Sequence, residues 1–427
     1  MVRESVIGNP FKWKGNLNFS CQVMVVATGA AIPLSTALGS VTAGLALLFW
    51  ILSGNFSEKF QAVKNNKVIV VSMFLFMLMA IAVVYSSAPV DEALRGLRKY
   101  LLFLLALVVA TTVSSEEKWR RWGVWAFLFG MLLTLVFSFT DSFGLTHIGE
   151  GPASGHAVFV GQITQNIFMA FAVYLLLHLF VRHVKYRWMI ALAIILALYN
   201  MLFLAMGRTG YVVLAFLLVL FSIQRVVASR GLNIKWLFLG GMAGVLITSM
   251  IFAAAYQTSD VFKYRINMAS EGFSMFQTGN SSSSTGLRLE FYANSIDLIM
   301  KKPWFGYGMG SLSSEYKKMA EQKGLVGDHV TRNPHNEYIV IAFQLGIVGL
   351  VIFLYLFFVQ WRASLILPCY EMFIAQGFIV VIMVGSLLNS LLLDHVTGLF
   401  FGFFTGLLFS GINGSSNAPI VSSNVSD

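Results

Sequence analysis

The sequence predicts an all-α polytopic membrane protein with about twelve transmembrane helices and one long loop before the tenth. Of its 427 residues, 57% are hydrophobic and 11% are charged. Soluble domains have roughly 25% charged residues. Apolar runs of about 20 residues, enough to cross a bilayer core of about 30 Å, recur along the chain. Cys21 and Cys369 lie in or beside such runs, which argues against a disulfide framework and a cysteine metal site.

Twelve apolar segments are the predicted membrane spans. They are 17–33, 37–54, 67–86, 100–113, 122–140, 157–181, 188–206, 209–226, 235–256, 336–360, 370–390 and 395–412. Pro33, with Ser35 and Thr36 after it, marks the break between the first two. The basic N-terminal stretch could belong to a signal peptide, but the many spans that follow favour an uncleaved first helix.

These spans divide the chain into four parts. Residues 1–256 hold the first nine spans, 257–334 form the long loop, 335–412 hold the last three spans, and 413–427 are expected to be disordered. Within the loop, "QTGNSSSSTGL" is typical of a flexible patch. The following stretch predicts two amphipathic helices joined by the glycine-rich turn "PWFGYGMG".

The basic residues predict the orientation of the spans. The net charge is +10, and the positive residues form short clusters between apolar runs, as membrane topology requires and nucleic-acid binding does not. If the N-terminus is cytoplasmic, sixteen of the 29 basic residues fall on the cytoplasmic side and four in short outer loops. Both termini are therefore expected inside and the long loop outside.

His335 is the candidate general base. It lies at the mouth of the tenth span, where Asn333 is a suitable N-cap and Pro334 suits the first helical position. A helix N-terminus carries partial positive charge and disfavours imidazolium, so a neutral ring there can accept a proton. The alternative is a histidine that only faces water at the interface.

Three arginines are candidate ligands for an anionic lipid headgroup. Arg208 lies in a tight outer corner, Arg265 follows the ninth span, and Arg288 begins the first loop helix. Arginine binds phosphate oxygens in pairs and keeps its charge. With one neutral base, these fixed charges suit a lipid diphosphate. The alternative for each is anchoring among lipid headgroups.

The sequence offers no ligand set for a metal ion. It has no Asp-x-Asp pair on the outer side, and His147 and His156 lack metal-ligand spacing. Asp91, Glu92, Arg95, Arg98 and Lys99 form an outer amphipathic stretch that suggests surface ion pairing, although its arginines could touch a lipid phosphate. Asp394 and His395 suggest interface positions. No cofactor is expected.

Three motifs resemble one family. "HNEYIVIAFQLGIVGL" resembles its signature of His-Asn, nine residues and Gly-x-x-Gly, and "GLRLEFYANSIDLIMKKPWFGYGMGSL" resembles its Arg-led helix and glycine turn. "MGRTGYVVL" resembles its arginine-containing outer corner, where Ser-Arg-Gly is commoner than this Gly-Arg-Thr. Together with twelve spans and the long outer loop, the chain is similar to bacterial O-antigen ligases, within a superfamily that includes O-antigen polymerases and protein O-oligosaccharyltransferases.

The resemblance implies a reaction in lipopolysaccharide biosynthesis. O-antigen would move from undecaprenyl diphosphate to a sugar hydroxyl of lipid A–core, on the periplasmic face of the Gram-negative inner membrane, with inversion and without metal or ATP. By motif, His335 is the implied base, and Arg208 and Arg288 are implied diphosphate ligands. Arg265 is carried over by position alone.

Other activities remain open from the sequence. Within the superfamily, the rivals are the polymerase and the protein oligosaccharyltransferase, although only a short polar tail follows Gly411. From a different class, a transporter of lipid-linked glycan would need ionisable or broken positions deep within its spans. The polar residues here gather at the outer mouths of the spans instead, which favours a glycosyltransferase.

Overall fold

The computed structural model describes residues 10–114, 116–148, 155–279, 281–324 and 331–412, with the side chains of 10–14 excepted. The predicted disordered tail, 413–427, lies outside them. The α-helices are α1 Pro10–Ala31, α2 Thr36–Leu52, α3 Phe56–Lys64, α4 Lys67–Val84, α5 Val90–Lys99, α6 Leu102–Val113, α7 Glu117–Ser142, α8 Gln162–Arg182, α9 Arg187–Tyr199, α10 Arg208–Arg230, α11 Ile234–Thr258, α12 Asp260–Gln277, α13 Ser284–Lys301, α14 Leu312–Lys323, α15 Glu337–Ser364, α16 Cys369–Leu388 and α17 His395–Phe409.

The predicted fold class, an all-α polytopic membrane protein, is confirmed. Within the described ranges, nine helical segments are long and apolar enough to cross a membrane, or up to ten if α2 and α3, bent by 114°, form one span. Each of the twelve predicted segments coincides with a helix. However, α1 carries several polar residues and α17 has only 15, so the count of twelve crossings stays a prediction.

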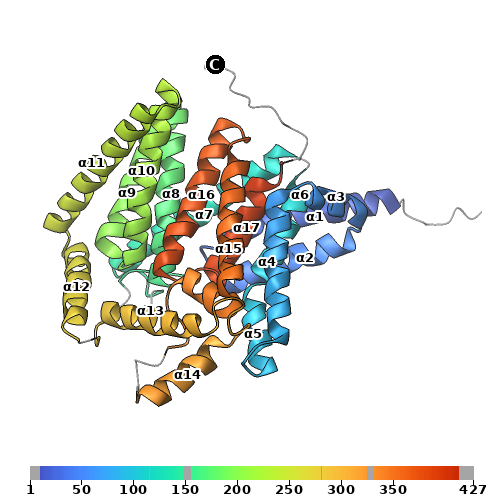
Figure 1. Ribbon diagram of the computed structural model, residues 1–427. Helices are drawn as coiled ribbons and strands as arrows, with labels where there is room; N and C mark the ends of the chain where they lie inside the picture. Colours follow the sequence, from blue (N-terminus) through green and yellow to red (C-terminus); the bar gives the residue numbers. More distant parts are fainter. Residues whose placement is uncertain (1–9, 115, 149–154, 280, 325–330, 413–427) are drawn as a thin grey trace, which may run out of the picture.

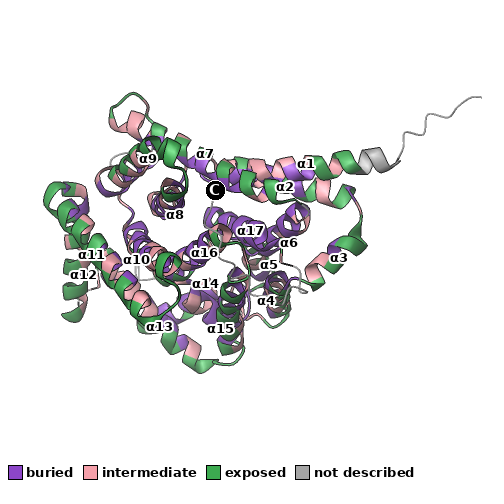
Figure 2. Ribbon diagram, turned by 90° about the horizontal axis from the view of Figure 1, so that it is seen from above, coloured by how far each residue is buried: buried purple, intermediate pink, exposed green. Residues whose placement is uncertain are grey.

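α17 is short because it lies inside the bundle. Every residue of it after His395 is buried, and Figure 2 shows it in purple between α6 and α16. Its contact with α6 depends on glycines spaced four residues apart. A Cβ on Gly402 would lie 2.3 Å from the Leu102 carbonyl oxygen, and one on Gly406 would lie 2.6 Å from that of Ala106. Small residues at this spacing let helix backbones approach closely within a membrane.

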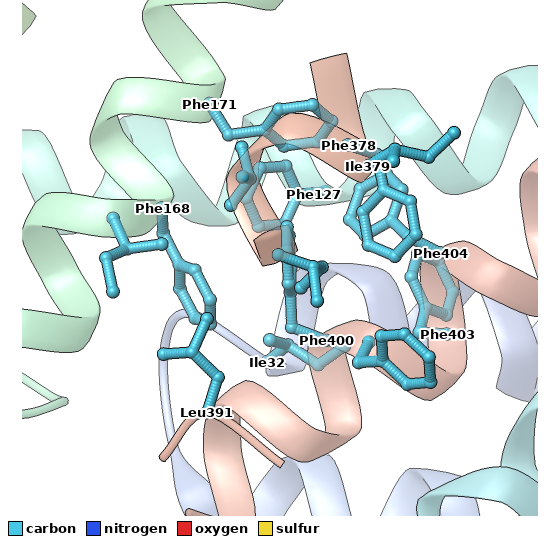
Figure 3. Close-up of a cluster of buried hydrophobic side chains, with 14 of the residues drawn as sticks. Ile32, Phe127, Phe168, Phe171, Phe378, Ile379, Leu391, Phe400, Phe403 and Phe404 are labelled. Carbon is cyan, nitrogen blue, oxygen red and sulfur yellow. The ribbon is translucent and has the colours of Figure 1, made fainter. Parts of the chain in front are cut away.

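An aromatic cluster joins α17 to α7, α8 and α16 (Figure 3). The rings of Phe127 and Phe404 are 5.1 Å apart and meet edge to face, and Phe168 and Phe400 are 4.6 Å apart. Aromatic pairs of this kind contribute about 0.5–1.5 kcal/mol beyond the area that they bury. The cluster fixes α17, and with it the loop that precedes α17, relative to the other helices.

The long loop forms one end of the molecule. Its helices α12, α13 and α14 lie at the bottom of Figure 1 with α5, while the turn after α10 lies at the top. The two predicted loop helices are present as α13 and α14; α12 is a third that the sequence pattern did not indicate.

The basic cluster of Arg120, Arg182 and Arg225 lines a cavity formed by α7, α8, α10 and α16.

The glycine-rich turn between α13 and α14 is inserted into a break in α15. Gly346 has φ +65° and ψ −164° inside α15, so the helical hydrogen bonds are interrupted there. The turn replaces them: the Gly308 N–H donates to the Gln344 carbonyl at 2.9 Å, and the Ile347 N–H donates to the Pro303 carbonyl at 2.7 Å. Gly308 also has positive φ and lies against the backbone of α4, where a side chain has no room. These contacts fix the loop against the break in α15.

Candidate functional site

His335 lies just before α15, in a conformation that the sequence did not predict. The expectation that Asn333 caps the helix is wrong: the cap is Asn336, whose side chain accepts from the Ile339 N–H at 3.1 Å. His335 has φ +57°, the left-handed region, which cannot continue into a helix. The Asn333 side chain holds this turn, because its oxygen accepts from the His335 N–H at 2.8 Å and from the Ser390 hydroxyl at 2.7 Å.

The surroundings of His335 favour a neutral ring. Burial lowers its pKa to about 4, and the positive charge of Arg288 acts in the same direction. The sequence argument predicted a neutral ring from the helix N-terminus, whereas in the structure burial is the largest cause of the lowered pKa. A hydrogen bond to the Asn389 side chain opposes both effects. An interaction that raises the pKa of a histidine stabilises the protonated ring, as expected when the amide oxygen accepts from a ring N–H.

Arg208 is the first residue of α10, and glycines bring it close to α8. A Cβ on Gly207 would lie 2.5 Å from the Gln162 carbonyl oxygen, and one on Gly210 would lie 2.4 Å from the Asn166 Cβ. The guanidinium donates to the hydroxyls of Thr285 and Ser284 at the start of α13, at 3.1 and 2.8 Å. Arg208 therefore connects the start of α10 to the long loop.

Arg265 extends from α12 toward the same place. It is half-buried and donates to the side-chain oxygen of Gln162 at 3.1 Å. Its Nε is buried and has no hydrogen-bond partner among the described residues. A buried N–H without a partner costs about 1–3 kcal/mol, so this group is suited to donate a hydrogen bond to a ligand oxygen.

Arg288 lies in the first turns of α13, next to the C-terminal end of α16. Its guanidinium donates to the Leu388 carbonyl at 3.4 Å, a long bond, and burial lowers its pKa. One turn further on, the Tyr292 hydroxyl donates to the His335 carbonyl at 3.1 Å. Arg288 and His335 are therefore held together by the same helix.

The structure brings all four predicted site residues to one place. The charges of Arg265 and Arg288 act on Arg208, and that of Arg288 acts on His335. Asn389 completes the link, because its amide donates to the Thr209 hydroxyl at 2.6 Å while it bonds the His335 ring. Among the described residues, no carboxylate lies within ion-pair distance of any of the three arginines. The result is a concentration of positive charge beside a neutral imidazole.

Sequence reasoning missed the residues that position this site. Glu337 is fully buried and accepts from the Leu392 N–H at 2.9 Å, the Leu393 N–H at 3.3 Å and the Tyr100 hydroxyl at 3.0 Å. It thereby holds the segment 389–394, which carries Asn389. Asn389 itself follows an apolar run, and only its contact with an element distant in the sequence indicates a role.

The acidic residues considered for a metal have other contacts. Asp91 pairs with Arg95 at 2.6 Å, as the sequence suggested for this stretch, and Asp394 caps α17 by accepting from the Thr397 N–H. In the part of the chain that the structure describes, no group of three His, Cys, Asp or Glu residues could hold a metal ion.

Comparison with known proteins gives one family. Searching the curated proteins finds no match to this chain. The family model described as O-antigen ligase matches residues 192–354. The matched segment runs from within α9 to the middle of α15 and so includes Arg208, Arg265, Arg288 and His335. Together with the helical membrane architecture, this match supports membership of the O-antigen ligase family.

Proposed function

We propose that this protein transfers O-antigen from undecaprenyl diphosphate to a sugar hydroxyl of lipid A–core, with inversion and without a metal ion. The reaction would take place at the periplasmic face of the Gram-negative inner membrane, with the long loop outside. The match of residues 192–354 to the O-antigen ligase family model supports a membrane glycosyltransferase of the ligase or polymerase type. The choice of donor, acceptor and mechanism rests on the site.

One observation carries the proposal: three arginines converge without a carboxylate between them. They reach the site from α10, α12 and α13, and their described hydrogen bonds go only to hydroxyl, amide and carbonyl oxygens. Half-buried like charges repel one another, so such a site is stabilised by an anion. A diphosphate offers several oxygens, and arginine binds such groups in pairs.

The proposed reaction is a single displacement. The acceptor hydroxyl gives its proton to a ring nitrogen of His335 while its oxygen attacks the anomeric carbon of the donor sugar. The bond from that carbon to the diphosphate oxygen breaks, and undecaprenyl diphosphate leaves with the bonding electrons. Attack opposite to the leaving group inverts the anomeric centre. The three arginines neutralise the charge that grows on the diphosphate.

His335 fits the role of base because it is neutral before reaction. A pKa of about 4 leaves the ring able to accept a proton throughout the neutral range. Base assistance is worth about 10²–10⁴-fold. The positive charge of Arg288 disfavours imidazolium while the diphosphate is absent. A bound diphosphate offsets that charge, so proton transfer to His335 becomes easier once the donor is present.

A reconstituted assay tests this proposal. Purified protein in liposomes is supplied with undecaprenyl-diphosphate glycan and either lipid A–core or a second portion of the glycan lipid. Transfer to lipid A–core supports the ligase. Growth of the lipid-linked glycan alone would identify a polymerase, and transfer to a protein acceptor an oligosaccharyltransferase. Movement of the glycan lipid between leaflets without a new glycosidic bond would identify a transporter.

A further inference from the structure

A second lipid-sized groove lies apart from the arginine site. It has a volume of about 740 Å³ and is formed by α2, α6, α17 and the end of α5. Its walls are mostly apolar, with Ala43, Leu47, Leu102, Leu105, Val108 and Leu399 among them. A Cβ at Gly44, which also lines it, would meet no atom within 4 Å. We call this cavity the α2–α6 groove.

Basic side chains line the outer end of the α2–α6 groove. Arg95, Arg98 and Lys99 come from the last turns of α5. Arg95 is paired with Asp91, but within the described ranges neither Arg98 nor Lys99 has a carboxylate within ion-pair distance. An apolar groove with unpaired cations at the headgroup level is complementary to a lipid whose head carries phosphate.

A second cavity adjoins the α2–α6 groove. This cavity, of about 480 Å³, shares Arg95 and Lys99 with the groove and extends to Arg332, Gln344 and Leu393. The charge of Lys99 also acts on Glu337. Leu393 belongs to the segment 389–394 that Glu337 holds and that carries Asn389, the partner of the His335 ring. The polar end of a lipid in this groove would therefore point toward the proposed base.

We propose that the α2–α6 groove binds the acceptor lipid. Its acyl chains lie against α2, α6 and α17, its phosphates bind Arg98 and Lys99, and its sugars extend through the second cavity to His335. This inference rests on the proposed function, in which two lipid-borne substrates must meet. Arg208, Arg265 and Arg288 already provide for the diphosphate of one, and the α2–α6 groove gives the other a separate cationic site.

Kinetics with two kinds of variant test the inference. Arg98→Gln with Lys99→Gln removes the charges at the rim, and Gly44→Trp fills the apolar wall. The charge variant is expected to raise KM for lipid A–core by about tenfold, the loss typical of a hydrogen bond to a charged group. Gly44→Trp should also raise this KM, because its indole occupies the space of an acyl chain. KM for the donor and kcat at saturation should stay unchanged. With dephosphorylated lipid A–core, the charge variant should differ little from the parent protein.

Matched controls remove the same charge or add the same bulk elsewhere. Lys263→Gln with Lys301→Gln neutralises two exposed lysines of the long loop. Gly241→Trp adds an indole on α11, where a Cβ would first meet a side chain at 4.0 Å. Both controls should leave KM for lipid A–core unchanged. Binding of undecaprenyl diphosphate, equal in all variants, shows that each has folded.

Acceptor binding without turnover separates this inference from the proposed function. Lipid A–core binding is measured in a His335→Ala background, with and without Arg98→Gln and Lys99→Gln. If the charge variant weakens binding in this background, but the parent protein with His335 intact transfers no glycan to lipid A–core, the proposed reaction is wrong and the groove assignment stands. If transfer occurs and neither groove variant changes acceptor KM, the groove assignment is overturned. Equal displacement of lipid A–core by phosphatidylglycerol vesicles would also overturn it, since the groove would then hold bulk anionic lipid.

Discussion

The side chain of Asn389 is hydrogen-bonded to the ring of His335, although the two residues are 54 positions apart in the chain. Asn389 ends α16 and His335 precedes α15. The same amide donates to Thr209, next to Arg208. Asn389 therefore sets the orientation of the proposed base relative to the proposed diphosphate site.

The first prediction concerns pH and Asn389. A base must be unprotonated, so activity is lost as pH falls through the pKa of His335, which is about 4. An unperturbed histidine, with a pKa of about 6.5, would lose activity near that pH. Turnover should instead stay level through that range and fall only as the pH approaches 4. Asn389→Asp places a carboxylate beside the ring, which favours imidazolium and should move the acidic limb up by about one to three pH units.

Asn389→Leu is the matched control for this shift. It removes the hydrogen bond without adding charge, so its acidic limb should not move upward. The measurement is kcat against pH for the three proteins. An unshifted limb in Asn389→Asp would mean that another group sets the pH dependence.

The second prediction concerns the His335 ring and its backbone. His335→Ala should lower turnover by about 10²–10⁴-fold and leave undecaprenyl diphosphate binding nearly intact. Because His335 has positive φ, an alanine there also strains the turn. His335→Gly relieves this strain, and it should be as inactive as His335→Ala if the ring is what matters. Recovery of activity in the glycine variant would assign the defect to the backbone, and His147→Ala serves as an exposed histidine control.

The third prediction concerns the geometry of Arg288. Arg288→Lys keeps a positive charge but replaces a planar fork by a single ammonium group. We expect binding of undecaprenyl diphosphate to weaken by about tenfold and transfer to fall with it. Arg288→Ala should be worse, because it removes the charge as well. Wild-type behaviour of Arg288→Lys would show that only the charge is required.

The fourth prediction concerns metal ions. We expect transfer to continue unchanged in excess EDTA, since fixed arginines supply the positive charge that a metal would provide. Activity that disappears and returns only with Mg²⁺ or Mn²⁺ would contradict this. Such a result would direct attention to Asp91 or Asp394, each of which would have to leave its partner to bind the ion.

The fifth prediction concerns topology. A reporter inserted within Ser281–Ser284 should be periplasmic, and one within Arg182–Arg187 should be cytoplasmic. The two segments lie at opposite ends of the bundle, next to α13 and at the end of α8 (Figure 1). Detection of the serine segment in the cytoplasm would remove the proposed site from the periplasmic face.

The pattern of apolar runs was enough to predict the class of fold. Each run forms a helix because its backbone must satisfy its own hydrogen bonds in lipid. The pattern could not show that α17 lies inside the bundle, since a buried helix and a lipid-facing helix are equally apolar. It also missed the break at Gly346, because a single glycine is tolerated in many membrane helices and only the inserted turn requires positive φ there.

The sequence by itself indicated which residues are candidates for the site. Arg208, Arg265, Arg288 and His335 were identifiable because charge and imidazole are rare beside apolar spans and because their motifs resemble one family. Tertiary structure decided how they meet. Asn336 caps α15 because Asn333 is engaged by Ser390, a residue 57 positions away. Burial, together with the charge of Arg288, lowers the pKa of His335. Such effects depend on what lies around a side chain in space, and contacts between distant segments are not encoded in any local pattern.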